Sequence, residues 1–288
     1  MASSEPGFGD RFTLTLVTDD PALAAEADAA GVQRIGIDLE RLGKAGRQAE
    51  HPQARISSHV LEDLGRLAPR LTRAKLFCRL DPLHPGTGEQ VERALGLGAG
   101  VLMLPYFAEA ADAARFLELV DGRAETVLLV ETAPAAWRVE LLAALDGLDE
   151  VMVGLNDLSW SMGVSNRFSL LASPLMQALA CAVRDAGRRF SVGGLGRWDD
   201  DDLQSPPDLI YAQYPRLQAQ GAWLARSFYR GPAPQAPTSQ HVRAAGTRPE
   251  VPAQPPAPQL ARLPLLGHRT GGLSQSRSSA LRAASCAA

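Results

Sequence analysis

The chain has 288 residues, of which 45% are hydrophobic and 21% are charged, and its formal net charge at pH 7 is −3. This composition is typical of a globular protein, and the near-neutral charge gives no electrostatic reason to expect a nucleic acid or a membrane surface as partner. The N-terminus lacks the basic and apolar regions of a signal peptide, and no apolar run approaches the roughly 20 residues that span a bilayer. We therefore expect a cytoplasmic protein.

Short apolar runs alternate with longer amphipathic stretches over residues 11–230. The Asp20-Pro21 pair is a helix-start signal, and Ser57 or Ser58 could cap the helix that ends at Leu67. The expected strands are 12–17, 34–38, 74–80, 101–105, 126–131, 150–154, 190–194 and 222–228. The expected helices are 22–30, 57–67, 88–97, 109–120, 134–145, 174–186 and 208–217. Eight strands that alternate with helices in this length predict a parallel sheet closed into a (β/α)₈ TIM barrel.

The composition changes near Arg230. The segment 231–288 is rich in Pro, Ala, Gln and Ser, and it has too little apolar surface to offset the entropy lost on ordering. We expect an N-terminal extension (1–10), a barrel domain (11–230) and a disordered tail (231–288). The barrel would lack a regular eighth helix, and the uncovered apolar surface would favour a homo-oligomer.

Two acids stand where the chemistry of such a barrel is expected, at the C-terminal ends of its strands. Glu131 ends the fifth expected strand, and Asp157 follows the sixth in Gly154-Leu-Asn-Asp. Two hard oxygen donors on neighbouring strands can share one Mg²⁺ or Mn²⁺. The alternative is that both acids cap the helices that follow them, and the spacing alone leaves both interpretations open.

Basic residues occupy the same end of the predicted barrel. Arg79 ends the third strand and can bind a carboxylate through two hydrogen bonds, or it makes an ordinary salt bridge. His84 lies one loop beyond Arg79, whereas His51 and His59 fall in or near a polar loop and are expected to be solvated.

The second expected strand ends in an acidic and basic run, Asp38-Leu-Glu-Arg41, with Lys44 and Arg47 following. Taken alone, this run predicts a solvated loop.

Five segments resemble the HpcH/HpaI aldolase and citrate lyase β-subunit family in order and spacing, and together they cover roughly residues 11–230. They are Ile37-Asp-Leu-Glu40, Leu76-Phe-Cys-Arg79, Ala99-Gly-Val-Leu-Met-Leu-Pro105, Leu128-Leu-Val-Glu-Thr132, and Val153-Gly-Leu-Asn-Asp-Leu-Ser159 with Met162-Gly163.

The resemblance implies a carbon–carbon lyase that uses a divalent metal, Mg²⁺ or Mn²⁺. Glu131 and Asp157 would hold the metal, and Arg79 would bind the carboxylate of pyruvate or an equivalent oxoacid. The metal would act as a Lewis acid when the C–C bond breaks.

The matching segments also place Asp38, Glu40 and Asn156 near the substrate. His84 or a metal-bound water would move the proton.

One position departs from the family. Aldolase members usually have a histidine base where this chain has Arg41, and citrate-lyase-type members have an acid there. We therefore expect Arg41 to be a catalytic residue at this position. The leading hypothesis is an aldolase acting on a small 2-oxo acid. A second is a citryl-CoA or malyl-CoA type lyase, with Arg41, Lys44 and Arg47 near the nucleotide phosphates. A third is a catalytically silent barrel that binds a small acid or acts as a scaffold.

Overall fold

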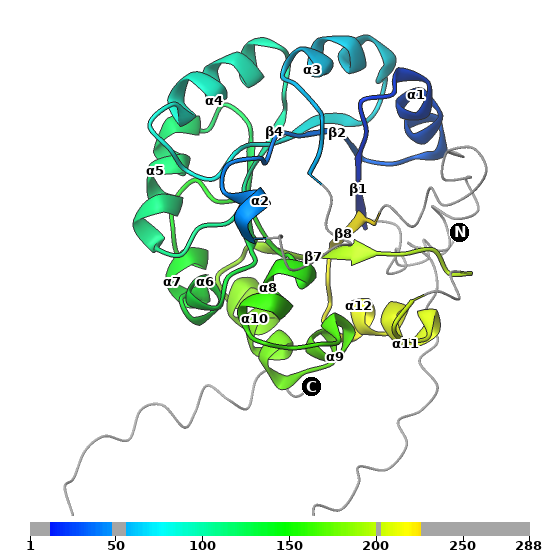
Figure 1. Ribbon diagram of the computed structural model, residues 1–288, viewed down its shortest axis with the longest axis vertical. Helices are drawn as coiled ribbons and strands as arrows, with labels where there is room; N and C mark the ends of the chain where they lie inside the picture. The colour runs from blue at the N-terminus through cyan, green and yellow to red at the C-terminus, as the bar shows by residue number, and fades with distance from the viewer. Residues whose placement is uncertain (1–11, 48–55, 200–202, 226–288) are drawn as a thin grey trace, which may run out of the picture. The chain divides into compact units, whose positions relative to one another are not determined.

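The computed structural model describes residues 12–47, 56–199 and 203–225. In this part of the chain, eight parallel strands form a closed barrel in sequence order, and the last strand pairs with the first. Figure 1 shows the strands enclosed by a ring of helices. The TIM-barrel prediction is therefore confirmed.

The strands are β1 (Thr13–Val17), β2 (Arg34–Asp38), β3 (Lys75–Arg79), β4 (Val101–Leu104), β5 (Glu125–Val130), β6 (Glu150–Val153), β7 (Arg189–Leu195) and β8 (Gly221–Leu224). The helices up to β5 are α1 (Pro21–Ala30), α2 (Lys44–Arg47), α3 (Glu62–Leu67), the 3₁₀ helix η2 (Ala68–Arg70), α4 (Thr87–Gly96) and α5 (Ala110–Val120). The later helices are α6 (Ala133–Trp137), α7 (Val139–Ala143), α8 (Leu155–Ser161), α9 (Arg167–Leu171), α10 (Pro174–Asp185), α11 (Pro207–Tyr211) and α12 (Gln213–Arg216).

Local signals explain several helix boundaries. The Asp20 carboxylate accepts a hydrogen bond from the Ala22 N–H at 2.8 Å, so it caps α1 as predicted. The expectation that Ser57 or Ser58 caps the next long helix is wrong, because α3 starts later, after Leu61, without a side-chain cap. Two expected helices are each divided in two: 134–145 forms α6 and α7, and 208–217 forms α11 and α12.

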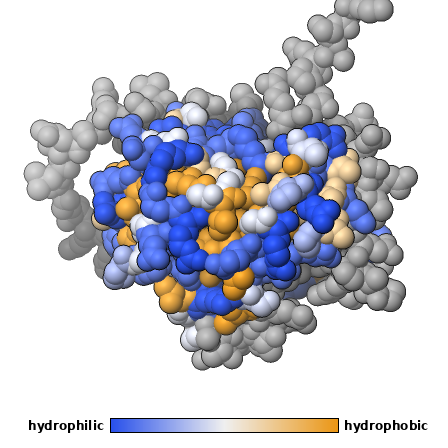
Figure 2. Space-filling model, turned by 90° about the horizontal axis from the view of Figure 1, so that it is seen from above, coloured by the Kyte–Doolittle hydropathy of each residue, from blue (hydrophilic) through white to orange (hydrophobic). Residues whose placement is uncertain are grey.

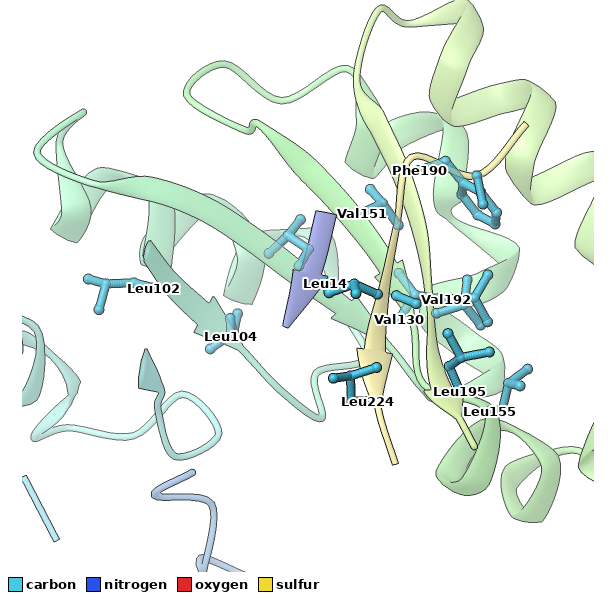
Figure 3. Packing of buried hydrophobic residues seen from close by; sticks show 14 of the residues in the cluster. Leu14, Leu102, Leu104, Val130, Val151, Leu155, Phe190, Val192, Leu195 and Leu224 are labelled. Carbon is cyan, nitrogen blue, oxygen red and sulfur yellow. The ribbon is translucent and has the colours of Figure 1, made fainter. Parts of the chain in front are cut away.

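Side chains alternate between the two faces of each strand, as the pleat of a β-strand requires. Outward-facing residues such as Leu102, Val151 and Phe190 are buried against the helices, and Figure 3 shows this packing. A smaller cluster fills the inside of the barrel: Phe77, Val101, Met103, Val127, Leu129 and Met152. Gly36 is required beside this cluster, because a Cβ there would lie 1.7 Å from the carbonyl oxygen of Phe77.

Charged side chains close the end of the barrel where the strands begin. Arg34 of β2 donates to Glu125 at 3.1 Å, and its guanidinium lies 2.8 Å from the Glu150 carboxylate. Arg189 of β7 lies 3.7 Å from the same Glu150. The opposite end, where the strands finish, carries the candidate site.

The described part of the chain ends just after β8. The outward-facing Ala222 and Leu224 are both buried, so the apolar surface expected over this strand is not exposed at these two residues. Whether a helix follows β8 lies outside the described residues, as do the predicted extension (1–10) and tail (231–288). Figure 2 shows a face on which hydrophilic residues surround smaller apolar patches. No helix in the described ranges is long and apolar enough to cross a membrane.

Candidate active site

Arg79 is the centre of a buried ion-pair cluster at the C-terminal ends of β2 and β3. Its Nε and one terminal nitrogen donate to the two carboxylate oxygens of Asp38 at 2.7 and 2.6 Å. The other terminal nitrogen lies 3.0 Å from Oε2 of Glu40. These contacts engage three of the five N–H groups of a guanidinium, so Arg79 keeps donor capacity for a substrate carboxylate.

Trp223 of β8 forms an aromatic wall beside this cluster. The centre of its ring lies 4.7 Å from Cζ of Arg79, a cation–π contact. The edge of the same ring system packs against Phe77, with 5.6 Å between ring centroids. This contact could not be predicted from the sequence, because Trp223 and Arg79 come from strands that are distant in the chain.

Electrostatics hold both members of the central pair in their charged forms. Burial alone would raise the pKa of Asp38, but the charge and hydrogen bonds of Arg79, together with Lys44, hold that pKa well below its usual value. Burial would likewise lower the pKa of Arg79, but Asp38 and Glu40 raise it above its usual value. The pair is therefore an anion and a cation throughout the physiological range.

Lys44 is a second cation of the cluster. Its ammonium lies 2.7 Å from Oε2 of Glu40 and 3.7 Å from Oδ2 of Asp38. Glu40 and Lys44 are both buried, so the expectation of a solvated loop is wrong for these residues. Figure 1 shows α2, which carries Lys44, inside the ring of helices. The four-residue spacing from Glu40 to Lys44 was the one sequence signal for this pair.

The predicted catalytic residue Arg41 makes its contacts with backbone atoms and with a neighbouring loop. Its guanidinium donates to the carbonyl oxygens of Ser57 at 3.3 Å and His59 at 2.6 Å. Its own N–H and that of Leu42 donate to Oδ1 of Asp81 at 2.8 and 3.1 Å. These bonds fix the loop that carries Glu40 and Lys44.

Glu131 follows β5 and is buried, with only 2% of its surface exposed. Its Oε1 accepts a hydrogen bond from the Tyr106 N–H at 3.0 Å. Gly154 gives the carboxylate room, because a Cβ at that position would lie 2.7 Å from Oε2 of Glu131. The helix-cap alternative for Glu131 is wrong, since Thr132 caps α6 through its hydroxyl group.

The charge of Glu131 is poorly compensated. Burial, Glu40 and Asp157 all raise its pKa, and together they outweigh the opposing charges of Arg79 and Lys44, so the pKa lies well above its usual value. Burial without full compensation is the condition in which a carboxylate binds either a proton or a metal ion.

Asp157 lies in the first turn of α8, where an acid also interacts favourably with the helix dipole. It is partly buried and close enough to Glu131 for its charge to act on that residue. The neighbouring Asn156, predicted to contact substrate, has an exposed side chain, and no contact joins it to the Arg79 cluster in the described part of the chain.

His84 lies in the loop between β3 and α4 and is partly buried. Its ring Nδ1 accepts a hydrogen bond from the Gly86 N–H at 3.0 Å, and the backbone N–H of His84 donates to the Thr87 hydroxyl at 2.9 Å. In the neutral ring the proton is therefore on Nε2, which is buried and has no hydrogen-bond partner among the described residues.

The donor set suits a hard divalent cation. Asp38, Glu40, Glu131 and Asp157 supply four carboxylates against the two cations Arg79 and Lys44, an excess of negative charge. Oxygen ligands of this kind are those that Mg²⁺ and Mn²⁺ prefer. Glu131 and Asp157 would provide only two protein ligands, and no group of three or more His, Cys, Asp or Glu with metal-binding geometry occurs among the described residues.

Known proteins resemble this chain in sequence and in fold. The HpcH/HpaI aldolase/citrate lyase family model matches residues 11–195. A 4-hydroxy-4-methyl-2-oxoglutarate aldolase of Chaetomium globosum is 30% identical over 83 residues, which are 28% of this chain and 31% of that protein. The aligned part thus spans about a third of this relative's length.

Two solved structures share the fold at low sequence identity. An HpcH/HpaI aldolase/citrate lyase family protein from Burkholderia cenocepacia has a TM-score of 0.58 at 17% identity, over 75% of this chain and 88% of that one. A citrate lyase from Burkholderia xenovorans has a TM-score of 0.58 at 16% identity, over 82% of this chain and 77% of that one.

Proposed function

Since this chain belongs to the HpcH/HpaI aldolase/citrate lyase family, we propose that it is a divalent-metal-dependent carbon–carbon lyase that cleaves or forms the aldol bond of a small 2-oxo acid. The observation that carries the proposal is the buried Glu131, whose pKa is raised by burial and by two neighbouring acids. A carboxylate in this environment is stabilised by a cation, and the resemblance to the family implies a divalent metal at this position.

Each residue has a distinct role in this proposal. Glu131 and Asp157 hold the metal, which when bound supplies Lewis-acid stabilisation for negative charge on the 2-oxo group. Arg79 orients the substrate carboxylate, because Asp38 and Glu40 already fix the plane and position of its guanidinium. We assign the transfer of the proton to His84, whose neutral ring carries its proton on Nε2.

The aldolase alternative is favoured over an acyl-CoA lyase by the contacts of two basic residues. Lys44 is buried and points at Glu40, and Arg41 is directed at backbone carbonyls. The buried Lys44 is not presented to solvent for a nucleotide phosphate, and the exposed Arg41 guanidinium already donates to the carbonyl oxygens of Ser57 and His59. A silent acid-binding barrel remains the outcome to be tested by measuring metal binding and turnover.

The reaction can be tested before the acceptor aldehyde is known. An enzyme that stabilises charge on the 2-oxo group exchanges the methyl protons of pyruvate with D₂O, which proton NMR follows directly with Mg²⁺ as the metal. We expect exchange with the parent protein and Mg²⁺, and none after chelation of the metal. Calorimetric titration with Mn²⁺ measures metal binding independently of turnover.

Matched variants identify the ligands. Glu131→Gln and Asp157→Asn keep the shape of each side chain, so each should abolish Mn²⁺ binding and exchange while the fold is retained. Glu118→Gln, on the exposed face of α5, is the control and should change neither. Tight Mn²⁺ binding by either site variant would show that the ligand assignment is wrong. Metal binding by the parent without exchange would favour the silent barrel.

A further inference from the structure

His59 accepts a backbone hydrogen bond at the point where β1 stops pairing with β2. The last donor from the β1 side is the Thr18 N–H, which bonds to the Gly36 carbonyl at 2.8 Å. Two residues further along β2, the Asp38 N–H faces the same side, and its acceptor is Nδ1 of His59 at 3.0 Å. The imidazole therefore takes the place that a β1 carbonyl would occupy.

The His59 ring is itself held from several directions. Its side chain is only 13% exposed, and its Nε2 lies 3.7 Å from Oδ1 of Asp19 in the loop after β1. The backbone of His59 is held as well: its carbonyl oxygen accepts a hydrogen bond from the Arg41 guanidinium, and its backbone N–H donates to the Ser57 hydroxyl at 3.3 Å. Because Nδ1 accepts, the proton of the neutral ring is on Nε2, which faces the Asp19 carboxylate.

We propose that His59 is a positioning residue for Arg79. By fixing the backbone of Asp38, it fixes the carboxylate that holds Nε and one terminal nitrogen of Arg79. This inference rests on the proposed function, in which Arg79 orients the oxoacid.

The test compares two substitutions that differ in one acceptor atom. In His59→Asn the amide oxygen falls close to the place of Nδ1 and can accept from Asp38, whereas His59→Ala has no acceptor. In the exchange assay, we expect His59→Ala to raise KM for pyruvate about five- to tenfold, with kcat changed less than about twofold. His59→Asn should restore KM to near the parent value.

The control is Gln33→Ala. The Gln33 side chain also accepts from a backbone amide, that of Leu14 at 2.8 Å, but at the opposite end of the barrel. It should lower stability without changing KM. An unchanged KM in His59→Ala, or a defect in His59→Asn as large as that in His59→Ala, would overturn the proposal.

A second readout does not depend on activity. The Arg79 Nε–H, held by Asp38, should give a slowly exchanging signal in ¹⁵N NMR, assigned by its loss in Arg79→Lys. We expect faster exchange of this proton in His59→Ala and parent-like exchange in His59→Asn. Parent-like exchange in both would overturn the positioning role. If the parent shows this NMR behaviour but exchanges no pyruvate protons, the proposed function fails while the positioning role stands.

Discussion

Asp38→Asn tests the central ion pair by changing one atom and one charge. In the parent, Nε of Arg79 lies 2.7 Å from the Asp38 carboxylate, and the asparagine oxygen of the variant can still accept a hydrogen bond from it. The new NH₂ group, however, would face a guanidinium nitrogen that lies 2.6 Å away. The ammonium of Lys44 would also lose an anion at 3.7 Å. The variant thus replaces the anion of the central pair by a neutral partner and leaves Glu40 as the anion beside Arg79.

The cost follows from the burial of the pair. Removing one partner of a buried ion pair costs about 3–5 kcal/mol, and Glu40 remains near Arg79, so we expect a loss of about 3 kcal/mol at pH 7. For a domain of 150–250 residues this corresponds to a fall in Tm of roughly 6–12 °C. Urea unfolding followed by tryptophan fluorescence measures the free energy directly.

The pH dependence has a definite sign. The pKa of Asp38 is lower in the folded protein than its usual 3.8. The contribution of the Asp38 charge to the free energy of unfolding is therefore fully present above pH 3.8, and it is lost as the pH falls through the pKa of the folded state. The stability difference between parent and Asp38→Asn should therefore be largest near neutral pH and shrink below about pH 4. Asp20→Asn is the control, since asparagine caps a helix as well as aspartate. A loss under about 1 kcal/mol at pH 7, or a difference that does not shrink in acid, would refute the reasoning.

Three further outcomes are expected. The pKa of Glu131 is raised in the folded protein, so the metal-free parent should lose stability as the pH rises above about 4.5. The Glu131→Gln variant should not show this pH dependence of stability. Mn²⁺ at 100 times its Kd should raise the free energy of unfolding of the parent by about 2.7 kcal/mol and leave that of the variant unchanged. Replacing Arg79 with Lys should weaken oxoacid binding by roughly 1–3 kcal/mol, because the planar fork is lost; an unchanged KM would show that another group holds the carboxylate. Deleting residues 232–288 should lower Tm by less than about 5 °C and leave Mn²⁺ binding intact; a larger fall would mean that the tail packs on the barrel.

The architecture and the positions of the principal charged residues could be predicted from the amino-acid sequence. Strand and helix periodicities are local, so the barrel and the cap at Asp20 could be predicted from nearby residues alone. Parallel strands in a closed barrel finish at one end, and this places Arg79 and Glu131 at the same mouth once their strands are recognised. Most predicted strand boundaries were shifted by a residue or two, because pairing with neighbouring strands decides where a strand stops.

The compensation of those charges depends on contacts that exist only in the folded chain. Three contacts join residues from separate strands or loops. Lys44 lies beside Asp38, Trp223 packs on Arg79, and His59 accepts a hydrogen bond from the backbone of Asp38. A polar loop is predicted from the sequence to be solvated, because no local pattern indicates which distant residues will bury it. The energy of a charge depends on that burial and on its neighbours in space, so the chemistry of this mouth is a property of the folded chain.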